Sequence, residues 1–216
     1  LVDFLLGNEQ ALFRRAQVRQ ILQHLYEREP DRFRAEATSV LTTDDIRFHI
    51  KETVLAVIAN LAAPTSEDAD LLLRVAATKP RFERRLWQQV RRPQWFLRFR
   101  DEGLIAAWLD GSDSVMREHA LNAMVSAARE HPGAIAALLG DRQKVPEYLD
   151  WLRWVTRFAD VHEDRQLLDL LLDAVRQGGY DSAEQDLWLT AHDLAKHQPL
   201  WAIELLRAWL IDRADA

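Results

Sequence analysis

Residues 164–178 read DRQLLDLLLDAVRQG, and this stretch carries a clear helical pattern. Its apolar residues recur at intervals of three, four and seven, and they are Leu167, Leu168, Leu171, Leu172 and Val175. Residues at these intervals lie on one side of an α-helix, and the charged residues between them lie on the other. The stretch therefore predicts a helix with one buried face.

The same pattern recurs along most of the chain. In residues 45–61 the stripe is Ile46, Ile50, Val54, Val57, Ile58 and Leu61. No segment shows the sustained alternation of a half-buried strand, so we expect no sheet. The expected helices span residues 10–28, 31–41, 44–62, 66–78, 81–91, 94–102, 104–109, 113–130, 133–139, 146–159, 164–177, 182–197 and 199–213. The loops between them are short, which favours antiparallel packing of consecutive helices.

Proline, glycine and capping residues agree with these boundaries. The seven prolines lie between the apolar stretches or in their first turns, where a missing N–H costs little. Glycines such as Gly103 fall at helix ends, where a left-handed residue closes the last turn. The segments Ser66-Glu67-Asp68 and Asp113-Ser114 have the composition of N-caps, with acidic groups near the positive end of the helix dipole.

About a dozen short helices in series cannot bury their apolar faces alone and must pack on their neighbours. We therefore predict an all-α fold, arranged as a HEAT-like α-solenoid, with a compact multi-helix bundle as the alternative. A weak internal echo favours the solenoid, because an Arg-x-His motif occurs at Arg47–His49 and again 70 residues later at Arg117–His119. We expect one helical-repeat domain over residues 1–216, with a possible sub-division near 103–112.

The composition is that of a folded protein and excludes several classes. The 216 residues include no cysteine, which excludes disulfide and thiolate chemistry and favours a reducing compartment, so we expect a cytoplasmic location. No apolar run approaches the roughly 18 residues that cross a bilayer, so we expect no membrane partner. The chain begins with Leu1 rather than methionine, and we interpret it as a fragment of a longer protein.

Residues 79–100 read KPRFERRLWQQVRRPQWFLRFR and form a basic block in an acidic chain. Its basic residues are Lys79, Arg81, Arg84, Arg85, Arg91, Arg92, Arg98 and Arg100. Glu83 is the one acidic residue in this stretch, so the block has a formal charge of +7 while the whole chain has −6. Such a local reversal of charge concentrates positive potential, and the eight basic residues are our candidate interaction site.

The block is expected to form two short helices that begin near Pro80 and Pro93. Trp95, Phe96 and Phe99 should pack inward on the second helix, while the arginines project. The arginines either bind an anionic partner or pair with acidic groups of the chain itself. As external partner we expect an acidic protein surface or another domain of the parent protein, because an acidic chain is a poor general ligand for nucleic acid.

No residue pattern indicates catalysis, a cofactor or a metal. None of the seven glycines is followed by lysine, which excludes a phosphate-binding loop, and no serine stands in a glycine elbow. The motif H-E-x-x-H is absent, and His192 and His197 are five residues apart, which is off a common helix face. We therefore expect neither an enzyme nor a small-molecule ligand. Most of the eight tryptophans are expected to lie in the core or between helices.

One stretch supports a family resemblance. The run FRRAQVRQILQHLYEREPDRFRAEATSVLTTDDIRFHIKETVLAVIANLAAPTSED contains a long helix at Arg15–Leu25, a linker around Pro30–Phe33, a helix at Ile46–Ile58 and a break at Pro64-Thr65. Residues 11–70, about a third of the chain, resemble the helical-repeat region that follows the nucleotide-binding domain in large bacterial STAND ATPases of the NACHT and AAA type. In that family the repeats recognise a trigger and control the ATPase core.

The resemblance implies a non-catalytic sensor or scaffold for protein interaction in bacterial signalling or defence, with the ATPase core outside these residues. The alternative is a helical-repeat protein that binds nucleic acid through the basic block. A salt-dependent affinity for DNA or RNA would distinguish the alternative from a protein scaffold.

Overall fold

The computed structural model describes residues 12–78, 86–87, 92–145, 147–177 and 184–212, and these residues are almost entirely helical. Twelve α-helices, one 3₁₀ turn and one π-helical turn lie within them, and none of these described residues is in a strand. The prediction of an all-α fold is therefore confirmed. No helix in the described ranges is both long and apolar enough to cross a membrane.

The chain divides into two compact units, residues 1–104 and residues 105–216. The boundary between Leu104 and Ile105 falls inside the stretch 103–112, where the sequence suggested a sub-division. A glycine marks this place. Gly103 has a φ of 73°, a conformation that only glycine adopts without strain, and its N–H closes the preceding helix by donating to the carbonyl of Arg100.

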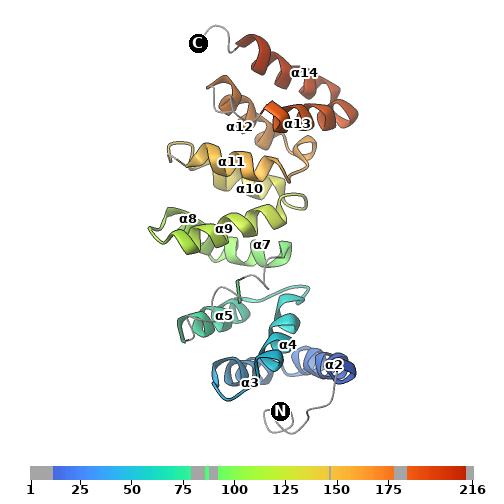
Figure 1. The fold of residues 1–216 in the computed structure, drawn as a ribbon, viewed down its shortest axis with the longest axis vertical. Helices are drawn as coiled ribbons and strands as arrows, with labels where there is room; N and C mark the ends of the chain where they lie inside the picture. Colours follow the sequence, from blue (N-terminus) through green and yellow to red (C-terminus); the bar gives the residue numbers. More distant parts are fainter. Residues whose placement is uncertain (1–11, 79–85, 88–91, 146, 178–183, 213–216) are drawn as a thin grey trace. The chain divides into compact units, whose positions relative to one another are not determined.

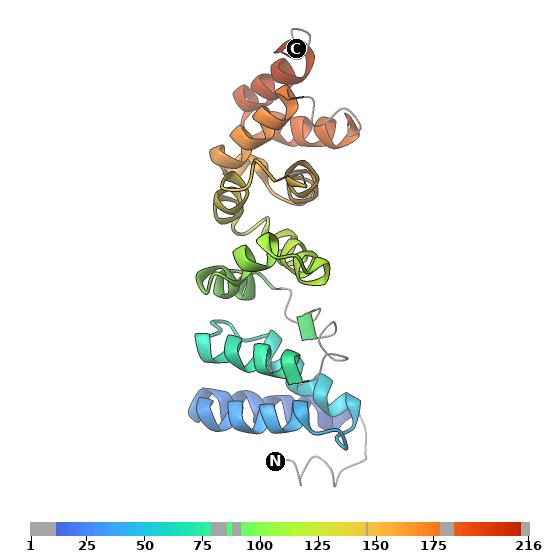
Figure 2. The same cartoon turned by 90° about the vertical axis from the view of Figure 1, so that its left-hand side faces the viewer.

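The first unit contains five described helices. They are α2 (Leu12–Arg28), α3 (Pro30–Thr42), α4 (Phe48–Ala59), α5 (Ser66–Thr78) and α7 (Pro93–Asp101). Figure 1 and Figure 2 show α2 and α3 side by side at the blue end of the chain, and α3 also contacts α4 and α5. The core of this unit holds Phe33, Leu41, Leu55, Ile58, Leu72, Trp95 and Phe96, each at most 1% exposed.

The second unit contains seven α-helices in its described part. They are α8 (Leu104–Asp110, which begins at the boundary), α9 (Ser114–Ala127), α10 (Pro132–Gly140), α11 (Tyr148–Thr156), α12 (Arg165–Arg176), α13 (Glu184–His197) and α14 (Pro199–Arg207). A 3₁₀ turn, η1, spans Val161–Glu163, and a π turn, η2, spans Ala208–Asp212. Contacts join helices that are close in the chain, such as α10 with α12 and α13 with α14. The stripe that predicted α12 is buried throughout.

The helix starts follow the expected capping chemistry, with one refinement. Pro30, Pro93, Pro132 and Pro199 occupy the first turns of α3, α7, α10 and α14. Asp113 and Asp164 cap α9 and α12 by accepting backbone N–H bonds. At α5 the cap is Thr65 rather than Ser66. The Thr65 N–H donates to Asp68 while the Thr65 hydroxyl lies 3.4 Å from the Asp68 nitrogen, the reciprocal pattern of a capping box.

Several expected helices are shorter in the structure, and the difference is largest for residues 44–62. The helix expected at 44–62 is shorter, because residues 44–46 form a turn and α4 begins only at Phe48. The Arg-x-His echo does not mark equivalent positions. Arg47 precedes the first residue of α4, whereas Arg117 is the fourth residue of α9, so the two motifs have different helical registers.

The tryptophans divide into three groups by burial. Trp87, Trp95 and Trp151 are at most 4% exposed and belong to the core. Trp108, Trp201 and Trp209 are partly covered by neighbouring helices. Trp154 and Trp188 are about half exposed, at 49% and 56%. Six of the eight therefore meet the expectation that most lie in the core or between helices, and Trp188 also packs edge-on against Trp209, with ring centroids 5.6 Å apart.

Candidate functional site

Most of the predicted basic block lies outside the described residues. Lys79, Arg81, Arg84, Arg85 and Arg91 fall in the ranges 79–85 and 88–91, as does most of the helix expected at 81–91. The structure describes three of the eight basic side chains, Arg92, Arg98 and Arg100. Arg92 is exposed immediately before α7, whereas Arg98 and Arg100 are partly buried.

Arg98 and Arg100 make their contacts within the first unit. Arg98 donates from Nε to the carbonyl of Pro64 at 2.8 Å, and its Nη1 bonds Ser66 and Glu102. Arg100 pairs with the adjacent Asp101. These two arginines therefore pair inside the chain, which was one of the two interpretations of the basic block.

Helix α7 uses its polar side chains to hold the connection between α4 and α5. Gln94, Trp95 and Arg98 donate to the carbonyls of Leu61, Ile58 and Pro64, respectively. The carbonyls of Leu61 and Pro64 lie beyond the end of α4, so these two bonds satisfy groups that would otherwise need water, whereas the Ile58 carbonyl also accepts from the N–H of Leu61. Trp95, Phe96 and Phe99 are buried as expected, at no more than 2% exposed. Trp95, Phe96 and Phe99 therefore have a structural role in packing α7 into the first unit.

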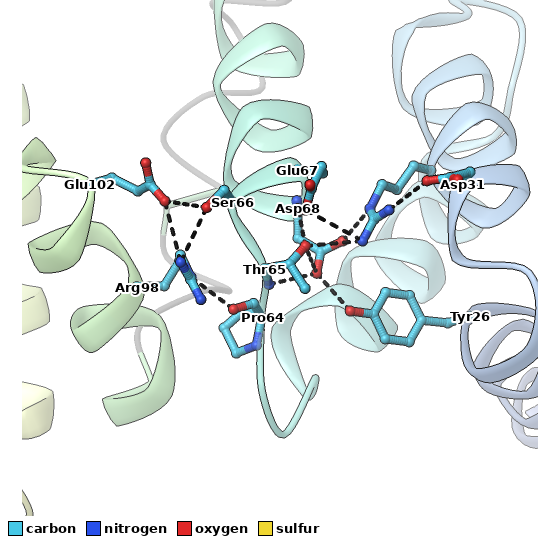
Figure 3. Close-up of polar contacts among 10 residues, drawn as sticks. Tyr26, Asp31, Pro64, Thr65, Ser66, Glu67, Asp68, Arg98 and Glu102 are labelled. Carbon is cyan, nitrogen blue, oxygen red and sulfur yellow. Dashed lines mark hydrogen bonds and ion pairs between the residues drawn. The ribbon is translucent and has the colours of Figure 1, made fainter.

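A second cluster holds the same connection from the other side, around the buried carboxylate of Asp68. Asp68 is 2% exposed and accepts hydrogen bonds from the Tyr26 hydroxyl at 2.7 Å and from Arg34 Nε at 2.8 Å. It also accepts from the N–H and hydroxyl of Thr65. Figure 3 shows Tyr26 on one side of the Pro64–Asp68 turn and Arg98 on the other.

The charges of this cluster are compensated locally. Burial alone would lower the pKa of Arg34, but the hydrogen bond and charge of Asp68 outweigh it and raise that pKa above its ordinary value. Arg34 also donates to Asp31 and to the Thr65 hydroxyl, which uses its remaining nitrogens. The cluster is a satisfied network that ties α2, α3 and α5 together, and its chemistry is that of a structural ion pair.

Alkaline pH is expected to weaken the fold through two tyrosines. Burial, followed by the hydrogen bond to Asp68, raises the pKa of Tyr26 from 10.0 to about 12. Burial, followed by the charge of Asp173, raises the pKa of Tyr148 likewise to about 12. Between pH 10 and pH 12 these two tyrosines ionise in the unfolded chain but not in the folded chain. The stability that the neutral phenols contribute is therefore fully present below pH 10 and is lost as the pH rises toward 12.

Urea unfolding followed by circular dichroism across this pH range measures the effect. The double variant Tyr26→Phe/Tyr148→Phe should lose less stability with rising pH than the unaltered chain. An identical fall in both proteins would contradict the assignment to these two phenols.

A third cluster, in the second unit, brings together residues that the sequence did not connect. His162 lies on η1, while Asp193 and His197 lie on the last turns of α13. His162 Nδ1 is 2.9 Å from Asp193 Oδ2, and the imidazoles of His162 and His197 stack with centroids 4.1 Å apart. Ligand atoms of the three residues all lie within 4.8 Å of one another, so they are the described residues that offer a metal-binding arrangement.

Sequence reasoning missed this cluster for a specific reason. It compared the histidines with known motifs and compared His192 with His197, which do not share a helix face. The informative signal was the four-residue spacing between Asp193 and His197, because residues four apart lie on the same face of a helix. The third member, His162, is 31 residues before Asp193, and no local spacing predicts that approach.

A small cavity adjoins the third cluster. It measures about 240 Å³ and lies between α13 and the segment that precedes η1. Its wall includes Arg129, Asp160 and Asp193, and Arg129 pairs with Asp160 at 3.2 Å. Exposed Phe158 and Leu189 also line it. The cavity combines paired charges with an apolar margin, and Asp193 belongs both to its wall and to the cluster.

Comparison with known proteins adds no assignment to this geometry. No protein-family model, no curated protein and no solved structure matches the chain.

Proposed function

We propose that the chain is a non-catalytic scaffold for protein interaction, built as a HEAT-like α-solenoid within a cytoplasmic bacterial STAND-type ATPase of signalling or defence. The partner is another domain of that protein or a separate protein, which the sequence predicts to be acidic. The observation that supports the proposal is the unpartnered apolar face of the last described helices.

Helix α14 is apolar on two opposite sides. Ala202 and Leu205 are buried toward the neighbouring helices, at 4% and 1% exposed. Leu200 and Ile203, three residues apart on the opposite side, are 73% and 62% exposed. A helix that is apolar on opposite sides is normally covered on both, so the second side of α14 has the character of an interface.

Helix α12, by contrast, is covered by neighbouring elements on most of its surface. Seven of its twelve residues are buried, and it contacts α10, α11, α14 and both short turns. Helix α14 has two buried residues, and the turn that follows it exposes Leu210 and Ile211 at 62% and 58%. We call Leu200, Ile203, Leu210 and Ile211 the C-terminal apolar face.

Covering this face would contribute favourably to the free energy of binding. Burying a Leu or Ile side chain contributes about 1.5–3 kcal/mol, so covering all four supplies several kcal/mol against the entropy lost on association. The resemblance of residues 11–70 to repeats of STAND ATPases agrees with this role. Contacts between helices close in the chain are also the pattern of stacked repeats.

Photocrosslinking in cells tests the proposal. A crosslinking amino acid at position 203 of the full-length protein should capture a protein segment, either from the same polypeptide or from a separate partner. The variant Leu200→Glu/Ile203→Glu should then weaken binding of that segment by roughly 100-fold, because two buried apolar side chains are replaced by charges.

A matched control distinguishes this face from exposed apolar residues in general. Ile21 on α2 and Val115 on α9 are 50% and 49% exposed, and the variant Ile21→Glu/Val115→Glu makes the same chemical change elsewhere. It should leave binding unchanged. Failure to capture any protein from position 203, or an equal loss of binding in the control, would refute the proposal.

A further inference from the structure

We propose that His162, Asp193 and His197 form a binding site for one divalent transition-metal ion, with zinc as the ion to test. The proposal concerns the place where η1 meets α13 in the second unit and does not depend on the C-terminal apolar face.

The distances between the three side chains are close to those of a metal site. The carboxylate of Asp193 meets both imidazoles, with Oδ2 2.9 Å from His162 Nδ1 and Oδ1 3.9 Å from His197 Nε2. Ligands about 2.0–2.2 Å from a tetrahedral zinc ion are roughly 3.3 Å from one another. The ligand atoms here lie within 4.8 Å of one another and the two rings stack nearly parallel, with 13° between their planes, so binding requires the carboxylate to move inward and at least one imidazole to turn its nitrogen lone pair toward the ion.

Two rigid elements supply the ligands. Asp193 and His197 are four residues apart on α13, which places both on one helix face. His162 comes from the 3₁₀ turn η1, which contacts α13, and its side chain is only 16% exposed. Asp193 and His197 are about half exposed, which leaves one side of the site open for a water molecule to complete four-fold coordination.

A neighbouring acid is placed where metal sites usually have one. Glu163 Oε1 lies 3.9 Å from Nε2 of His162, the ring nitrogen that faces away from Asp193. A histidine that binds a metal through one nitrogen usually donates the other N–H to a carboxylate, which fixes the tautomer. If Nδ1 binds the ion, Glu163 can accept from Nε2 only after its half-exposed side chain moves about 1 Å closer, because 3.9 Å is too long for a hydrogen bond. Two imidazoles and one carboxylate favour zinc and related transition metals over magnesium.

Isothermal titration of the 216-residue chain with Zn²⁺ tests the site. One ion per chain should bind, and Co²⁺ should give the visible absorption of a nitrogen- and oxygen-ligated ion. His162→Gln, Asp193→Asn and His197→Gln should each lower the Zn²⁺ affinity by about 100-fold or more. Glu163→Gln should lower it by about 10-fold, the lower end of what an outer carboxylate usually contributes.

His192→Gln is the matched control, because His192 is exposed on the same helix but is not part of the cluster. It should bind Zn²⁺ as tightly as the unaltered chain. His197 is itself exposed, so His197→Gln should keep the fold, which circular dichroism checks. The proposal is overturned if no saturable Zn²⁺ binding is found, if Mg²⁺ binds equally well, or if His192→Gln weakens binding as much as His197→Gln does.

Discussion

Replacing Asp68 by asparagine is expected to lower the free energy of unfolding by about 3–5 kcal/mol. Asp68 is 2% exposed, and it compensates the charge of Arg34, whose side chain is only 12% exposed. Asp68→Asn removes the buried partner of Arg34 and leaves its charge paired only with the exposed carboxylates of Asp31 and Glu67. Asparagine also places an N–H₂ group where the carboxylate accepts from Tyr26, Arg34 and Thr65.

Urea unfolding followed by circular dichroism measures this loss. Asp70→Asn is the matched control, because Asp70 lies on α5 two residues away and is exposed, and its change should stay within about 0.5 kcal/mol. The double variant Arg34→Met/Asp68→Asn should be more stable than Asp68→Asn, since it removes both charges together and keeps an acceptor for Tyr26 and Thr65. Equal losses for Asp68→Asn and Asp70→Asn would show that the cluster does not stabilise the fold.

Replacing Trp95 by alanine is expected to cost about 3–5 kcal/mol of unfolding free energy. Trp95 is fully buried, and its ring lies 5.3 Å from that of Phe99. Its Nε1 donates to the carbonyl of Ile58 at 3.2 Å and so joins α7 to the end of α4. The variant loses the packing of a large side chain and the bond between these two helices.

Two further variants separate these contributions. Trp95→Phe keeps an aromatic ring but removes the N–H, so it should cost less than alanine does, with about 1 kcal/mol assigned to the hydrogen bond. Trp154→Ala removes a tryptophan that is 49% exposed and should cost clearly less than Trp95→Ala. If Trp154→Ala is as destabilising as Trp95→Ala, burial does not explain the effect. Urea titration measures all three.

The candidate sites were less accessible to sequence reasoning than the helices were. The basic block was visible as a run of charge, but two of its three described members, Arg98 and Arg100, are already paired with groups of the same unit. The carboxylate of Asp68 was recognised only as part of a helix start. The partners that bury it, Tyr26 and Arg34, lie 42 and 34 residues earlier in the chain.

The sequence by itself determined where helices form and which faces they bury. The signals are local, because helix geometry repeats every 3.6 residues and capping spans one turn. They include the apolar stripe of α12, the cap Asp113 and the prolines that open α3, α7, α10 and α14. Only the tertiary structure decided which polar groups meet. His162 reaches Asp193 across 31 residues, and the contact depends on how α13 packs against η1, which local spacing does not encode.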